Sequence, residues 1–155
     1  PLTVLAVSVM AHWKGAEIVV AAIDELRQQG VPASLNLVGP WADSDYRRFV
    51  EHEITRRNLS AAVRIVGEVS RDELYQQYAS ASVFCLMSTC AMAEIGDAGG
   101  EYFAPSDLPG IVGSLGRLLT DQAHWEQLSV AARQNAERFH WADCSVPLRQ
   151  IFDIR

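Results

Sequence analysis

The stretch that most constrains the fold lies at the start of the chain. Residues 2–10, LTVLAVSVM, form a nearly continuous apolar run. Strands covered by helices on both faces have this pattern, whereas a strand with one solvated face alternates between apolar and polar residues. An amphipathic segment follows from Ala16, and its apolar residues recur at helical spacing until Gly30, which suits a helix C-terminus. The first residues therefore predict a strand and helix of a parallel α/β sheet.

The same alternation of apolar strands and amphipathic helices continues along the chain. Further strands are expected at 34–38, 63–66 and 83–87, with a short one at 102–103. Further helices are expected from about 44 to 54, 70 to 81, 107 to 119, 122 to 138 and 146 to 154. Strand and helix in turn, at least four times, predict one α/β domain over residues 1–155: a doubly wound parallel sheet with helices on both faces.

The charge and the cysteines narrow the classes of partner. The net charge of −6 argues against a nucleic-acid binder, which would need a broad basic face. Cys85, Cys90 and Cys144 form no Cys-x-x-Cys pair, and the four histidines have no metal-ligand spacing. No apolar stretch is long enough to span a bilayer. We expect a cytoplasmic protein with no bound metal or cofactor and no transmembrane segment.

The candidate binding residues follow the predicted strands, since ligands of open parallel sheets bind beyond the carboxyl ends of the strands. Lys14–Gly15 lies between the first strand and helix, where a cation and helix amides attract phosphate. Gly39 and Gly67 each end a strand, and Ser88–Thr89 follows the fourth. A solvated lysine, ordinary turn glycines and helix capping explain the same residues without a ligand. Neither Gly-x-Gly-x-x-Gly nor a Walker loop is present.

In combination, these stretches resemble the C-terminal, donor-binding domain of family-four glycosyltransferases, a Rossmann-like half of the two-domain GT-B architecture. The matching stretches are VSVMAHWKGAEIVVAAIDEL, LNLVGP, VRIVGEVSRDELYQQYASASVFCLMS, AEIGDAGGEYFAPSDLPGIVGSLGRLLTD and FHW. The resemblance implies metal-independent transfer of a sugar from a nucleotide diphosphate sugar, with retention of configuration. It also implies an N-terminal domain, absent from this sequence, that holds a glycan or other acceptor and offers a possible peripheral membrane contact.

The resemblance also assigns residues to parts of the donor. Lys14 would contact the diphosphate, Val66–Gly67 with Arg64 would face the base, and Ser88–Thr89 would lead to the sugar. The complete expected contact set is Ser8, Lys14, Gly15, Gly39, Arg64, Val66, Gly67, Ser88 and Thr89.

The sequence departs from the family pattern at two places. Val9 stands where the family carries an arginine. The family's Glu-x-Phe-Gly-x-x-x-x-Glu-Ala segment should fall between Cys90 and Ala91, so we hypothesise that roughly two dozen residues are missing there. A Cα–Cα distance of about 3.8 Å across that junction would refute a missing loop. We expect this fragment alone to be inactive. A nucleotide-sugar epimerase and a non-catalytic scaffold domain remain open alternatives. A phosphoacceptor receiver domain fits poorly, because the first strand ends without acidic residues.

Overall fold

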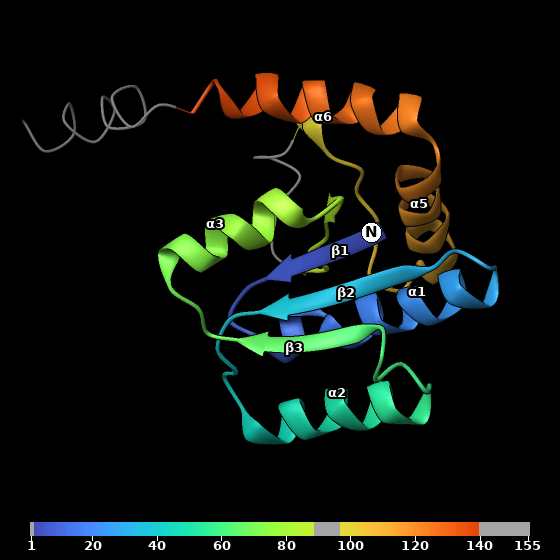
Figure 1. The fold of residues 1–155 in the computed structure, drawn as a ribbon, viewed down its shortest axis with the longest axis vertical. Coiled ribbons are helices and arrows are strands. Elements are labelled where there is room, and N and C mark those ends of the chain that lie inside the picture. Colours follow the sequence, from blue (N-terminus) through green and yellow to red (C-terminus); the bar gives the residue numbers. More distant parts are fainter. Residues whose placement is uncertain (1, 89–96, 140–155) are drawn as a thin grey trace, which may run out of the picture.

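The fold is built on one parallel sheet. The computed structural model describes residues 2–88 and 97–139. Its strands are β1 (Leu2–Val7), β2 (Ala33–Val38), β3 (Val63–Gly67) and β4 (Val83–Phe84). They lie in the order β3-β2-β1-β4, and each neighbouring pair is parallel (Figure 1). The predicted parallel α/β sheet is confirmed.

Helices cover both faces of this sheet. They are α1 (Ala16–Gln28), α2 (Ser44–Arg56), α3 (Arg71–Ser80), α5 (Leu108–Thr120) and α6 (Gln122–Ala136), with short 3-10 turns η1 (His12–Lys14) and η2 (Asp97–Gly99). α1 packs between α2 and α5 on one face, and α3 lies on the other (Figure 1). On that second face, the Asn36 amide of β2 donates to the Gln77 side chain of α3 over 2.9 Å.

The two faces are covered unequally. Leu35 and Leu37 of β2 and Ile23 and Leu26 of α1 are fully buried, and α5 adds its own apolar stripe to the same core. By contrast, α3 buries none of its residues. Most of the hydrophobic stabilisation therefore comes from the face that carries α1, α2 and α5.

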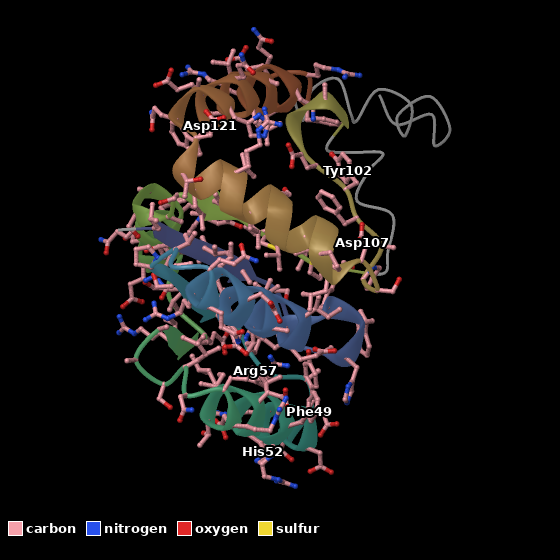
Figure 2. All side chains as sticks on the ribbon, turned by 90° about the vertical axis from the view of Figure 1, so that its right-hand side faces the viewer. Phe49, His52, Arg57, Tyr102, Asp107 and Asp121 are labelled. Atoms are coloured by element: carbon pink, nitrogen blue, oxygen red, sulfur yellow. The ribbon has the colours of Figure 1, made fainter. Side chains whose placement is uncertain are left out.

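Three sequence-based expectations about local structure were wrong. The fourth strand was expected to reach residue 87, but β4 pairs with β1 only at Val83 and Phe84. Residues 102–103 form no strand. The helical spacing of residues 44–54 predicts that Phe49 faces inward together with Tyr46, Val50 and Ile54. Phe49 is instead 46% exposed, because α2 packs through the other three positions. Figure 2 shows His52 on the side of α2 that faces away from α1. The expected helix at 146–154 and the Cys90–Ala91 junction lie outside the described residues.

Candidate functional site

The carboxyl ends of the four strands meet at one edge, and the loops that follow them are tied together there. The backbone N–H of Ser8, after β1, donates to the Val38 carbonyl over 3.1 Å. The N–H of Gly39, after β2, donates to the Gly67 carbonyl over 2.7 Å. Three of the predicted contact residues, Ser8, Gly39 and Gly67, are therefore neighbours.

Lys14 lies at the same edge of the sheet, on the β4 side of β1 rather than on the β2 side. It is the last residue of η1, and its backbone N–H donates to the Ala11 carbonyl over 2.8 Å. Its ammonium Nζ donates to the Ser88 hydroxyl, beyond β4, over 3.3 Å. β1 has β2 on one side and β4 on the other, so this contact crosses the point where the strand order changes direction. Open α/β sheets bind their ligands at such a point.

Two of the predicted glycines are explained by close backbone packing. At Gly15 the backbone is left-handed (φ 60°), and a Cβ atom would lie 2.9 Å from the Met87 carbonyl oxygen. At Gly39 (φ 128°) a Cβ atom would lie only 2.0 Å from the Ser8 carbonyl oxygen. Gly67 (φ 80°) differs, because no atom lies within 4 Å of the Cβ position. The space above β3 is therefore open.

The remaining predicted residues lie at varying distances from this edge. Val66 is half-buried beside Gly67. Arg64 lies in β3 opposite Asn36 and is exposed on the α3 face of the sheet. Thr89 is outside the described residues. Their assignment to the base and the sugar stays a prediction.

Sequence reasoning placed Tyr46 in the core but missed the use of its hydroxyl. Tyr46 is fully buried in α2, and its hydroxyl oxygen accepts the Ala16 backbone N–H over 3.0 Å while donating to the Glu17 carboxylate. Burial, and then the hydrogen bond to Glu17, raise the pKa of Tyr46 well above its usual value. The first amide of α1, expected to be available to phosphate, is therefore occupied. A buried tyrosine needs such a partner, which is the signal that could have found it.

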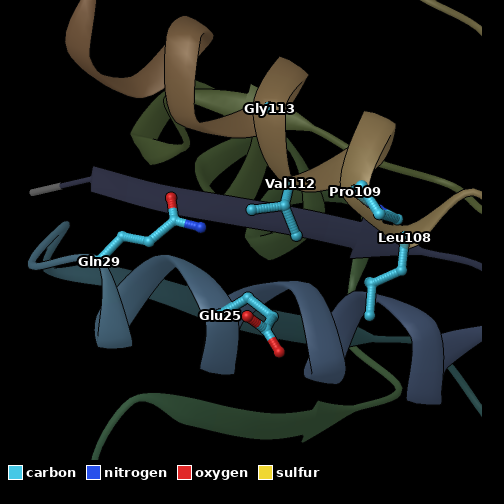
Figure 3. A pocket seen from close by; sticks show the side chains of 6 residues that line it. All are labelled: Glu25, Gln29, Leu108, Pro109, Val112 and Gly113. Atoms are coloured by element: carbon cyan, nitrogen blue, oxygen red, sulfur yellow. The ribbon is translucent and has the colours of Figure 1, made fainter.

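Other features of the described residues lie away from this edge. A pocket of about 340 Å³ lies between α1 and α5, lined by Glu25, Gln29, Leu108, Pro109, Val112 and Gly113 (Figure 3). Residues 2–88 and 97–139 contain no group of three His, Cys, Asp or Glu side chains arranged to hold a metal. Within the same ranges, every helix is too short or too polar to cross a membrane.

Comparison with known proteins identifies the family. The profile described as "Glycosyl transferases group 1" matches residues 1–99. A search of curated protein sequences found no match. Among solved structures, Anabaena HepE in complex with UDP and glucose matches with a TM-score of 0.81 and 18% identity, over 98% of this chain and 48% of that one. Sucrose-phosphate synthase from Thermosynechococcus elongatus matches with a TM-score of 0.81 and 22% identity, over 98% and 45%.

A further similar structure covers a single domain. It is the C-terminal domain of a group 1 glycosyl transferase, LpcC, from Francisella tularensis, with a TM-score of 0.67 and 15% identity over 86% of this chain and 81% of that one. The chain thus spans about half the length of HepE and of the synthase. These likenesses show the Rossmann-like fold of a GT-B glycosyltransferase. Since the family profile covers more than half of the chain, the protein belongs to the group 1 glycosyltransferases.

Proposed function

We propose that this chain is the donor-binding domain of a retaining glycosyltransferase, which moves a sugar from a nucleotide diphosphate sugar to an acceptor. The observation that carries the proposal is the contact between Lys14 Nζ and Ser88 Oγ, 3.3 Å apart at the strand switch point. The HepE structures, which contain UDP or UDP-glucose, support a uridine nucleotide as the first ligand to test. The LpcC match supports a place in the C-terminal half of a longer enzyme.

In sugar transfer, the residues at this edge must stabilise the negative charge that develops on the leaving diphosphate. When the bond between the sugar and the diphosphate breaks, the diphosphate leaves with that charge. A lysine ammonium about 4 Å from a phosphate oxygen contributes on the order of 4 kcal/mol of Coulomb energy near a protein surface. Its bond to Ser88 holds the Lys14 amine at this edge in advance. The proposed mechanism therefore needs no metal ion.

With the diphosphate at Lys14, the base and the sugar of the donor can be assigned to the neighbouring residues. The open space at Gly67 suits a planar base lying against the backbone of Val66–Gly67, with Arg64 nearby on β3. Ser8 and Gly39 form the backbone floor between the β1 and β2 loops. Ser88, followed by Thr89, leads toward the sugar.

Parts outside the described residues complete the proposal. The acceptor is held by a second domain, which also makes any peripheral membrane contact, and the enzyme works in the cytoplasm. This domain alone binds donor without turnover, because proximity of both substrates supplies much of the rate. We also propose that a segment of roughly two dozen residues belongs between Cys90 and Ala91. Sequencing the encoding DNA across that junction tests this directly, and an uninterrupted Cys–Ala codon pair would refute it.

Calorimetric titration of the purified protein with UDP tests the binding role. Lys14→Ala should weaken UDP binding about ten- to a hundredfold, because it removes the cation from the diphosphate site. Arg47→Ala is the matched control. It also deletes one positive charge, but from an exposed pair with Glu51 on α2, and should leave the affinity unchanged.

Three results would contradict the proposal. Absence of heat with wild-type protein would favour a scaffold domain, and equal affinity of Lys14→Ala and wild type would remove Lys14 from the site. In the full-length enzyme, isomerisation of the donor sugar without acceptor would instead indicate an epimerase.

A further inference from the structure

The start of α1 has no cap from its own chain segment. The N-cap residue is Gly15, which has no side chain, and the first N–H groups of any α-helix lack partners within the helix. The partner comes from α2 instead. The hydroxyl oxygen of Tyr46, 30 residues further along the chain, accepts the Ala16 N–H over 3.0 Å. A side chain from another helix thus accepts an N-terminal N–H of α1, a role that a serine or aspartate at the N-cap usually has.

The direction of the hydrogen bonds at Tyr46 is fixed. A phenol has one proton, and that of Tyr46 is donated to the Glu17 carboxylate. Its lone pairs are then left to accept from the backbone. Burial and the hydrogen bond to Glu17 raise the pKa of Tyr46, so the phenol keeps this proton across the physiological range.

The ring of Tyr46 also contacts the other side of the turn that carries Lys14. The His12 ring in η1 lies 4.2 Å from the Tyr46 ring, centroid to centroid. Tyr46 therefore contacts the residue two before Lys14 through its ring and the residue two after it through its hydroxyl. Between these contacts the chain passes through Gly15, whose backbone is left-handed. A turn held on both sides keeps the Lys14 backbone in place, so the side chain starts from a fixed position on its way to Ser88.

We propose that Tyr46, supported by Glu17, is a positioning residue for phosphate binding: it clamps η1 to the start of α1 so that the Lys14 amine is held toward Ser88. This inference rests on the proposed function, because it gives Tyr46 a role through Lys14. Neither Tyr46 nor Glu17 need touch the ligand. Their effect is to lower the cost of ordering the lysine when the diphosphate binds.

A competing effect has the opposite sign, and this makes the inference testable. The Glu17 carboxylate lies in the first turn of α1, three residues after Lys14, and its negative charge would repel a diphosphate bound at Lys14. If repulsion dominates, Glu17→Gln tightens UDP binding. If positioning dominates, Glu17→Gln weakens it, because a neutral amide is a poorer acceptor for the Tyr46 hydroxyl than a carboxylate.

The experiment compares three probes in calorimetric titrations of the intact protein: UDP, inorganic pyrophosphate and uridine. Tyr46→Phe keeps the ring against His12 and removes the hydroxyl. It should weaken UDP and pyrophosphate binding about three- to tenfold, the size expected for the cost of ordering one long side chain, and leave uridine within about twofold. Glu17→Gln should weaken the same two probes. Tyr78→Phe is the matched control on α3 and should change none of them. Circular dichroism shows whether each variant is folded at the titration temperature.

The outcomes separate this inference from the proposed function. If Lys14→Ala weakens UDP binding but Tyr46→Phe does not, the clamp is refuted and the binding site stands. An equal loss for uridine would also refute it, because a role through Lys14 acts only on phosphate. If Lys14→Ala has no effect, the proposed function fails first. Should Tyr46→Phe not fold, Glu17→Gln decides, and unchanged or tighter UDP binding overturns the clamp.

Discussion

Gly39 gives the sharpest test of how the loops at the carboxyl edge are held together. In Gly39→Ala, the new Cβ atom would lie 2.0 Å from the Ser8 carbonyl oxygen, so the two loops must separate by about 1 Å. The backbone must also keep φ near 128°, which costs alanine roughly 1–3 kcal/mol. Separation weakens the Ser8–Val38 and Gly39–Gly67 bonds, each contributing about 0.5–1.5 kcal/mol. The sum is a loss of about 2–6 kcal/mol in the free energy of unfolding.

Two other glycines provide matched controls for the same Gly→Ala change. Gly67→Ala meets an unfavourable φ of 80° but no neighbouring atom, so its cost should be only about 1–2 kcal/mol. Gly113→Ala lies within α5 with open space at its Cβ, and should stabilise the protein by about 0.4–1 kcal/mol. Urea denaturation followed by circular dichroism measures all three, and Gly39→Ala should also lower Tm by roughly 10 °C. The reasoning is refuted if Gly39→Ala is no more destabilising than Gly67→Ala.

Three further predictions follow from the described residues. Val9 is 52% exposed beside the β1 loop, so Val9→Arg should tighten UDP binding about three- to tenfold at low salt, with the gain shrinking in calorimetry at high ionic strength. Glu53 has its pKa lowered to about 2, first by the hydrogen bond from Arg56 and also by that from Arg57. The stabilisation by Glu53 is therefore complete above pH about 4.5 and lost as the pH falls toward 2; Glu53→Gln should flatten this part of a stability–pH curve, and an unchanged slope would contradict the assignment. Burial raises the pKa of the Cys85 thiol to about 12, so mass spectrometry should find Cys85 unmodified by iodoacetamide until urea unfolds the protein.

The sequence was sufficient for the architecture because its signals are local. The apolar run of β1 and the helical spacing of α1 each specify one element, and parallel strands joined by helices allow few arrangements. The wrong details depended on neighbours. The length of β4 is set by where β1 can pair with it, and the exposure of Phe49 by which stripe of α2 meets α1. Periodicity alone contains neither fact.

The same distinction applies to the site. Lys14 and Ser88 could be named from their places after strands, because the carboxyl ends of parallel strands share an edge. That they touch depends on β4 lying next to β1, a matter of strand order that no local pattern encodes. The hydroxyl of Tyr46 was missed for the same reason: its partners, Ala16 and Glu17, belong to another helix.

The two edge strands of the sheet differ in how readily an additional strand could pair with them. Among the described residues, β3 and β4 both lack an outer neighbour. β3 bears the charged Arg64 and β4 is only two residues long, and both features limit unwanted pairing at a sheet edge. β4 also bears the half-exposed Phe84, which lies beside Tyr78 of α3. An added strand with its covering helix could pair with β4 and bury Phe84 and Tyr78, whereas beside β3 it would lie next to the charged Arg64. The β4 edge is therefore the more favourable place for an additional strand.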